Sequence, residues 1–207
     1  ALTTQNNDAA NYNVAVGYAA GTAITTGIKN TLIGGLAGDT ITTGVNNTAL
    51  GYNTLQATTT ASENVALGSH AMYTNTTGAS NTAVGYWSLF ANTTGANNVA
   101  VGYNALDANT TAASNTAVGY ASLGTNTTGA NNTSLGFESL YANTTAANNT
   151  AVGYAALTAN TTGTQNVSLG AYALDANTTA NNNTAVGYAS LGANTTGTEN
   201  VAVGKSA

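Results

Sequence analysis

Side chains that could carry out chemistry are few in this sequence and are scattered along it. The 207 residues include a single histidine, His70, no cysteine and seven carboxylates. Nucleophilic catalysis needs a nucleophile, a base and an orienting group that converge on one point. The threonine hydroxyls are the only repeated nucleophile candidates, and no base accompanies them. We therefore predict that the chain is not an enzyme and uses no cofactor.

The acidic residues do not predict a metal site. Asp39, Asp107 and Asp175 recur at the same place in the repeat described below. Asp107 and Asp175 are four repeats apart, which corresponds to roughly 19 Å along a stack of strands. One metal ion cannot span that distance, and the nonapeptide calcium-binding motif is absent. We predict no metal site, and we expect His70 to be a solvated surface residue.

Composition excludes further classes of ligand. Charged residues make up 4% of the chain, and the net charge is −5. Two lysines and no arginine leave too little positive charge to neutralise nucleic-acid phosphates. No apolar run approaches the ~18 residues that a membrane span requires, and no signal peptide is visible. We predict no nucleic-acid partner, no membrane insertion and, without cysteine, no disulfide.

An Asn-Thr-Thr triplet is the most regular polar feature. It fits the acceptor rule for N-linked glycosylation. It could instead form ladders of side-chain hydrogen bonds that mark a turn. A third possibility is an ice-binding face of threonine hydroxyls, although adjacent residues of a strand point to opposite faces. The candidate glycosylation residues are Asn75, Asn92, Asn109, Asn126, Asn143, Asn160, Asn177 and Asn194.

Aromatic residues also recur at a fixed place in the repeat. Tyrosine combines an apolar ring with a polar tip, so a strip of tyrosines could contact a carbohydrate or a cell-surface receptor. Alternatively, the rings could stack and cover the end of a coil or the seam between chains. The candidate contact residues are Tyr86, Trp87, Tyr103, Tyr120, Tyr154, Tyr172 and Tyr188.

An internal repeat of 17 residues positions all of these side chains. The phrase Asn-(Thr/Val)-small-aliphatic-Gly begins at Asn13 and recurs every 17 residues up to Asn200, which makes twelve copies. We number the positions of each repeat from 1 at this Asn to 17. The unit is too short for a helical hairpin and lacks a 3.6-residue apolar spacing. Short β-branched segments separated by Gly and Asn indicate strands and turns.

The sequence therefore predicts an all-β fold, a single-chain β-solenoid with two short strands per coil. We place one strand at positions 1–5 and the other at about positions 8–14. The solenoid covers residues 13–207, and a partial or divergent coil precedes it at residues 1–12. Twelve coils at the spacing of parallel strands would make a rod of roughly 55 Å.

The composition of each position predicts which side chains form the core. Position 4 is always Val, Leu or Ile, and position 9 is Leu in most repeats, so both are expected inside. Positions 7 and 10 vary widely and are expected in solvent. The first two repeats carry Gly21 and Gly38 at position 9, but Ile24 and Ile41 three positions later. We expect apolar volume to have moved along the chain there, with a locally altered coil.

Position 3 is nearly always Ala or Ser. If position 4 points inward, position 3 points outward, because side chains alternate along a strand. An outward face that stays small suggests that another chain approaches it, although a narrow core or a tight turn could also demand small residues. We predict parallel homomeric association, most simply a trimer, with Ala83, Ala100 and Ala117 near the interface.

The repeats share the phrase N-T-A-V-G-Y-x-A-L-x-x-N-T-T-G. It resembles the left-handed β-roll repeats of trimeric autotransporter adhesin heads, and it is similar to repeat arrays of phage tail-fibre-like and bacterial surface proteins. The resemblance covers about residues 13–204. It implies left-handed coils and homotrimeric rods that are secreted or displayed on a cell surface or virion, where they bind surfaces or act as spacers.

We therefore expect a structural or adhesive shaft module of an extracellular or viral fibre. One alternative is a self-assembling extracellular filament subunit, with or without glycans. The other is an ice-binding β-solenoid.

Overall fold

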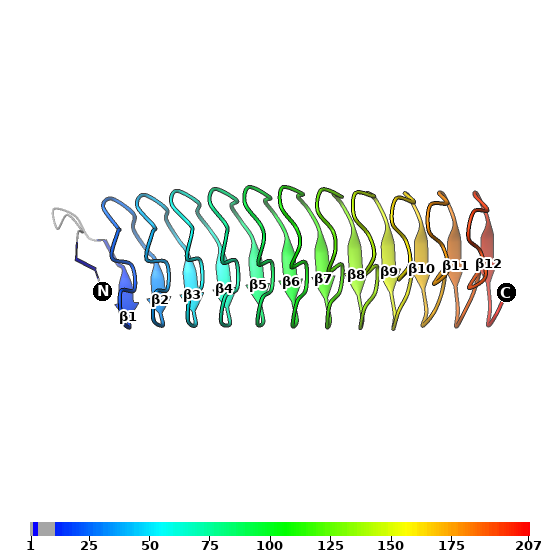
Figure 1. Cartoon of the computed structure of the whole chain (residues 1–207), viewed down its shortest axis with the longest axis horizontal. Helices are drawn as coiled ribbons and strands as arrows, with labels where there is room; N and C mark the ends of the chain where they lie inside the picture. Colours follow the sequence, from blue (N-terminus) through cyan, green and yellow to red (C-terminus); the bar gives the residue numbers. More distant parts are fainter. Residues whose placement is uncertain (1, 4–10) are drawn as a thin grey trace.

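The computed structural model describes residues 2–3 and 11–207 and shows a rod of stacked coils (Figure 1). Each repeat makes one coil and contributes one three-residue strand at positions 2–4. The strands pair in parallel, in sequence order, in a single sheet. They are β1 (Val14–Val16), β2 (Thr31–Ile33), β3 (Thr48–Leu50), β4 (Val65–Leu67), β5 (Thr82–Val84), β6 (Val99–Val101), β7 (Thr116–Val118), β8 (Thr133–Leu135), β9 (Thr150–Val152), β10 (Val167–Leu169), β11 (Thr184–Val186) and β12 (Val201–Val203).

Strand pairing follows the 17-residue period without a slip. Val84 pairs with Val101, and Val101 pairs with Val118. The predicted all-β solenoid with 17-residue coils is thus confirmed. The partial coil expected at residues 1–12 lies mostly outside the described residues. In the part of the chain that the structure describes there is no helix, and hence none that could cross a membrane.

The rest of each coil is not a second strand, and the prediction of one at positions 8–14 is wrong. Positions 7 and 9 have positive φ in every complete coil, as at Ala121 (φ 49°) and Leu123 (φ 54°). Left-handed residues turn the chain and cannot continue an extended strand. Their backbone groups still join neighbouring coils: the Leu123 N–H donates to the Ser139 carbonyl at 3.0 Å.

The interior of the rod is lined by positions 3, 8 and 9. The leucines of position 9, such as Leu106 and Leu123, have no exposed surface, so this part of the predicted core is confirmed. The prediction for position 4 is wrong, because Leu50 is 48% exposed and Leu135 is 46% exposed. Small side chains at position 3 face inward instead, since the leucine of position 9 already fills the narrow coil.

Because position 3 faces inward and position 4 faces outward, the predicted interface residues lie in the core. Ala83, Ala100 and Ala117 all belong to the buried core and have no exposed surface. Another chain cannot reach them, so their assignment to an interface between chains is wrong. The alternative, that a narrow core demands small residues at position 3, agrees with the structure.

Glycine at position 5 is required for two reasons. Gly119 has φ +135°, a conformation that other residues rarely adopt. A Cβ atom added to it would lie 2.3 Å from the carbonyl oxygen of Gly136 in the next coil. Successive coils therefore stack directly through their backbones at this turn.

The first two coils exchange the sites of their apolar residues, as predicted. A Cβ atom added to Gly38 would lie 2.7 Å from Cδ1 of Ile41 and 2.9 Å from Cδ2 of Leu32, so these two side chains fill the space that the leucine of position 9 occupies in later coils. The backbone, however, is not altered. Gly38 has φ 54°, within the range of the leucines that replace it, such as Leu123. The expectation of a locally altered coil is wrong because the exchange conserves the side-chain volume inside.

Candidate functional site

The asparagines of the Asn-Thr-Thr triplets form a buried ladder along the rod. Nδ2 of Asn92 donates to Oδ1 of Asn75 at 2.8 Å and to the Gly95 carbonyl at 2.9 Å. The same bonds recur through Asn109, Asn126, Asn143, Asn160, Asn177 and Asn194.

Seven of these eight asparagines have no exposed surface, and Asn194 is partly exposed. An N-linked glycan needs the amide nitrogen that the ladder buries and uses. Glycans at these seven residues are therefore incompatible with the folded coil, and the hydrogen-bonded ladder is what the structure contains. A second asparagine ladder runs at position 1, where the Asn98 N–H donates to Oδ1 of Asn81 at 2.9 Å.

The two threonines of each triplet have different surroundings. At position 13 the hydroxyl joins coils, as where Oγ1 of Thr110 donates to the Thr127 carbonyl at 3.1 Å. At position 14 the side chain is exposed in all eleven complete coils, and its hydroxyl has no hydrogen bond to the described residues. We call these residues the threonine column: Thr26, Thr43, Thr60, Thr77, Thr94, Thr111, Thr128, Thr145, Thr162, Thr179 and Thr196.

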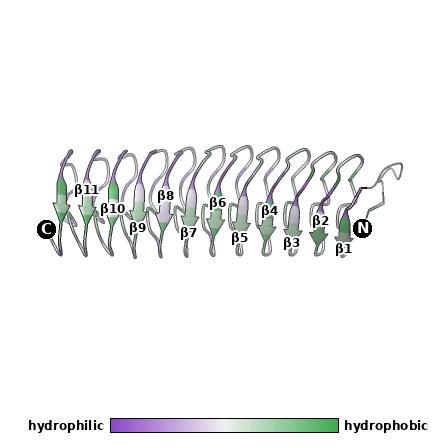
Figure 2. Cartoon of the chain, turned by 180° about the vertical axis from the view of Figure 1, so that it is seen from behind, coloured by the Kyte–Doolittle hydropathy of each residue, from purple (hydrophilic) through white to green (hydrophobic). Residues whose placement is uncertain are grey.

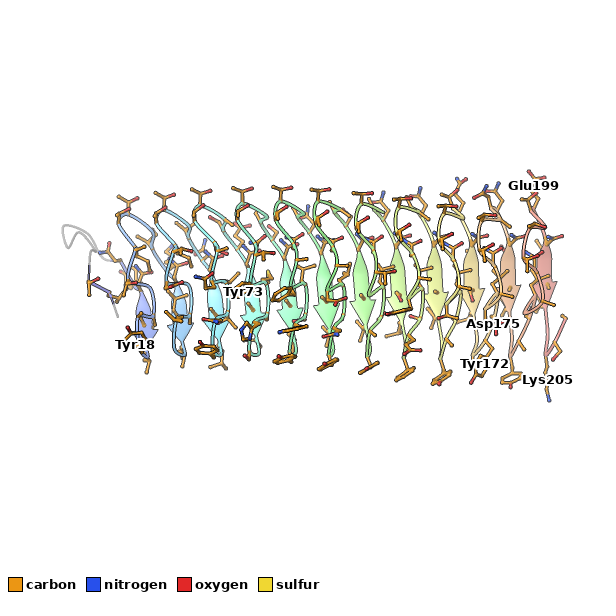
Figure 3. All side chains as sticks on the ribbon, viewed as in Figure 1. Tyr18, Tyr73, Tyr172, Asp175, Glu199 and Lys205 are labelled. Atoms are coloured by element: carbon orange, nitrogen blue, oxygen red, sulfur yellow. The ribbon has the colours of Figure 1, made fainter. Side chains whose placement is uncertain are left out.

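Aromatic rings form a continuous array along one edge of the rod, where Figure 3 labels Tyr18, Tyr172 and Lys205. From the third to the eleventh coil, each coil contributes one ring whose centroid lies 5.0–6.1 Å from the next. We call this array the aromatic ladder. Its members are Tyr52, His70, Tyr86, Tyr103, Tyr120, Phe137, Tyr154, Tyr172 and Tyr188.

In two coils the ring of the aromatic ladder comes from position 7 instead of position 6, which was not predicted from the sequence. Position 6 holds Ser69 in the fourth coil and Ala171 in the tenth, so neither coil has a ring there. In both coils position 7 supplies it. His70 contacts the rings of Tyr52 and Tyr86, and Tyr172 contacts those of Tyr154 and Tyr188. Considering positions 6 and 7 together would have revealed the array.

His70 is therefore part of the aromatic ladder. It is a partly exposed surface residue, as expected, but its ring also packs against those of Tyr52 and Tyr86. Its Nδ1 lies 2.8 Å from Oγ of Ser69, and its Nε2 lies 3.3 Å from Nδ2 of Asn53. Both ring nitrogens thus have polar neighbours within the coil stack.

In the middle of the aromatic ladder the rings lie face to face. Tyr103 and Tyr120 are 5.4 Å apart with planes inclined by 5°, and Tyr86 and Tyr103 are 5.6 Å apart at 14°. The faces cover one another, while the edges and hydroxyls face solvent. A sugar ring cannot stack on these covered faces. Trp87 adds a lateral ring that stacks on Tyr86 at 5.3 Å and contacts Phe90 at 5.1 Å.

The outward side of the strands forms a further surface, which we call the apolar sheet face. It consists of the side chains at positions 2 and 4 of β1–β12. Position 2 is Thr or Val throughout, and no charged residue interrupts the face. Figure 2 shows several strands in the green of apolar residues, such as β4, β6 and β10, paler strands where position 2 is threonine, such as β3 and β8, and hydrophilic residues in the loops at one edge. The position 4 residues are Val16, Ile33, Leu50, Leu67, Val84, Val101, Val118, Leu135, Val152, Leu169, Val186 and Val203.

The carboxylates of the described residues do not gather with one another or with His70 into a metal-binding cluster. In the described part of the chain, no three His, Asp or Glu side chains gather as metal ligands would. Burial raises the pKa of the Asp39 and Asp107 carboxyl groups above the ordinary aspartate value. The two residues lie in different coils and do not share a site.

Comparisons with protein-family models, with curated proteins and with solved structures find no match to this chain. The candidate surfaces are therefore those that the coil stack itself presents. They are the apolar sheet face, the aromatic ladder and the threonine column.

Proposed function

We propose that the chain is a non-enzymatic structural rod, a shaft module of an extracellular or viral fibre, that associates with parallel copies of itself. The observation that carries this proposal is the apolar sheet face. Its aliphatic side chains run the whole length of the rod, and none of those at position 4 is buried in the single chain: half are exposed and half are partly exposed.

The size of the apolar sheet face supports a protein partner. Strand geometry makes it roughly 55 Å long and about 10 Å wide, hence on the order of 500 Å². Monomeric proteins rarely expose contiguous apolar patches larger than a few hundred Å². If all of this area were apolar and exposed, covering it would contribute about 12 kcal/mol per chain before the cost of association. The threonines at position 2 and the partial burial of Val101 and Val118 make the gain smaller than this upper bound.

The regular spacing of side chains along the apolar sheet face favours a second copy of the chain as the protein partner. Side chains recur along it once per coil, and a parallel copy presents the same spacing, so every coil can pack against an equivalent coil. Val and Leu alternate irregularly at position 4. Side chains of uneven length can interdigitate with those of a second copy, whereas they fit the flat surface of an ice crystal less well. Closed symmetry about the rod axis would bury the face in every copy. The trimeric state and left-handed coil come from the resemblance to adhesin heads.

The aromatic ladder would remain accessible in such an assembly, because it lies along the edge of the rod beside the sheet (Figure 3). Its exposed hydroxyls and ring edges, together with Trp87, are the side chains we assign to contact with a carbohydrate or a cell-surface receptor.

Substitution at the apolar sheet face tests the proposal. The unmodified chain should sediment as a trimer at micromolar concentration. Changing Val101 and Val118 to Lys places like charges on the face in each copy and should yield monomers. The matched control changes Thr94 and Thr111 to Lys, which adds the same charge at exposed residues of the threonine column and should leave the trimer intact. A monomeric unmodified chain would refute the self-association, and equal effects of both pairs would refute the assignment of the face.

The threonine column favours one second candidate function, ice binding. It is constant in all eleven complete coils although it is exposed, and its hydroxyls are free to bind water at the strand repeat of about 4.8 Å. Thermal hysteresis of the purified chain, lost on changing Thr94 and Thr111 to Lys, would support this function. Absence of hysteresis in the unmodified chain would exclude it.

A further inference from the structure

We propose that the aromatic ladder is a site of oxidative cross-linking, at which tyrosines of adjacent coils are joined as dityrosine. The pairs concerned are Tyr86 with Tyr103 and Tyr103 with Tyr120. The co-reactant is a one-electron oxidant of the peroxidase class that uses hydrogen peroxide. This inference is independent of the proposed shaft function.

The geometry of these pairs suits coupling within one chain. Their ring centroids are 5.6 and 5.4 Å apart, and their planes are nearly parallel. The three tyrosines are between 42% and 48% exposed, so an oxidant can reach their hydroxyls. Each ring already has its partner beside it. Rotation of the two side chains can therefore bring a Cε atom of one tyrosine, ortho to its hydroxyl group, against a Cε atom of the other. The coils themselves need not move.

The chemistry requires no group beyond the two phenols and the oxidant. Each phenol loses one electron and one proton, and the two phenoxyl radicals join through a new bond between ring carbons adjacent to the C–O carbon. The hydrogens on those carbons move to the phenol oxygens as the rings regain aromaticity. Two tyrosines thus lose two hydrogens in all, and one hydrogen peroxide is reduced to two waters.

The chain contains internal controls for this pairing. Phe137 stands between Tyr120 and Tyr154, 5.0 and 5.1 Å from their rings, and it has no phenol to oxidise. Tyr18 is 83% exposed, but the next coil has Gly35 at the equivalent position, and Tyr18 makes no ring contact within the described residues. If exposure alone decided reactivity, Tyr18 would react first and would join different molecules.

The test treats the purified full chain with peroxidase and hydrogen peroxide. Dityrosine fluorescence and mass are then read on the band of single-chain size after denaturing electrophoresis. The unmodified chain should give dityrosine within single chains, with a mass lower by two hydrogens for each link. Tyr103→Phe removes both parallel pairs and should abolish the links among Tyr86, Tyr103 and Tyr120 in a peptide digest, whereas Tyr18→Phe should keep them.

A gain-of-function variant makes the test independent of damage to folding. Phe137→Tyr extends the run of parallel tyrosines through Tyr154 and should raise the yield of dityrosine above that of the unmodified chain. The proposal is overturned if dityrosine appears only in multimers or not at all. It is also overturned if Tyr103→Phe and Tyr18→Phe lose the links among Tyr86, Tyr103 and Tyr120 equally, or if Phe137→Tyr adds no dityrosine.

Discussion

Replacing Gly119 by alanine probes the contact that sets the spacing of the coils. The backbone at Gly119 has φ +135°, and forcing an alanine into this region costs about 1–3 kcal/mol. The new Cβ would also lie 2.3 Å from the Gly136 carbonyl oxygen, which is backbone and cannot rotate away. Overpacking of this kind costs about 1–3 kcal/mol more.

The two costs act together, so Gly119→Ala should lower the free energy of unfolding by about 2–6 kcal/mol. A small opposing gain of about 0.4–1 kcal/mol comes from the reduced entropy of the unfolded chain. Urea denaturation followed by circular dichroism measures the difference. Because coils contact only their neighbours, hydrogen exchange should accelerate most in β7 and β8, on either side of the substituted turn.

A matched pair of adjacent glycines provides the control. Gly34 has φ +137°, and its added Cβ would lie 2.3 Å from the Gly51 carbonyl oxygen, as at Gly119. An added Cβ at Gly35 would meet only the Tyr52 ring, at an ordinary 3.4 Å. Gly34→Ala should therefore be destabilising and Gly35→Ala nearly neutral. Equal stabilities of these two variants would refute the argument that the position 5 glycine is required by conformation and by close stacking.

Three further substitutions test the interior. Asn109→Ala should lower the free energy of unfolding by about 3 kcal/mol in urea denaturation, because it removes the donor to the buried Oδ1 of Asn92 and one of the two acceptors of the Asn126 amide. Thr111→Ala should cost little, and equal losses would mean that the ladder does not stabilise the stack. Asp107→Asn should raise the melting temperature at neutral pH and should change it little below the ordinary aspartate pKa of 3.8, since burial raises the pKa of Asp107 in the folded chain. The ionised carboxylate of Asp107 therefore destabilises the fold more as the pH rises through the pKa of the folded chain. If the stabilisation by Asp107→Asn instead grew as the pH was lowered, this reasoning would be contradicted. Gly38→Leu alone should overpack the second coil at a cost of about 1–3 kcal/mol, and adding both Ile41→Asn and Leu32→Ala should restore most of the loss in thermal melts; a triple variant no better than the single one would refute the exchange of volume.

Much of the fold was predictable because the sequence repeats without insertion. A strict 17-residue period puts equivalent residues at equivalent heights, so the parallel stack and the register of β1–β12 follow from the spacing of Asn13 to Asn200 alone. The leucines of position 9 were placed inside because a position that stays large and apolar in many coils is usually buried, and at this position the structure confirms the rule. The loss of leucine at position 9 in the first two repeats, together with the gain of Ile24 and Ile41 at position 12, could also be read from the aligned repeats.

The direction of each strand's side chains was not predictable in this way. Alternation along a strand assigns positions 2 and 4 to one face and position 3 to the other, but it does not say which face is inside. Constant aliphatic residues at position 4 favoured the wrong choice. In a coil this narrow, the leucine of position 9 leaves room only for a small side chain opposite it, so Ala83 and its equivalents turn inward. The apolar side chains of position 4 consequently form the outer face that we assign to self-association.

The candidate surfaces could be identified only from the tertiary structure, because they too depend on the direction of the side chains. The triplets alone allow Asn75 either a glycan or a ladder, and only the direction of its side chain, toward the interior, decides between them. His70 and Tyr172 occupy a variable position, and their membership of the aromatic ladder appears only where their rings meet those of neighbouring coils. Period and composition are properties of the sequence by itself and determined the coil stack. Which side chains face inward, and which meet across coils, depends on the space enclosed by each coil, and this only the folded chain defines.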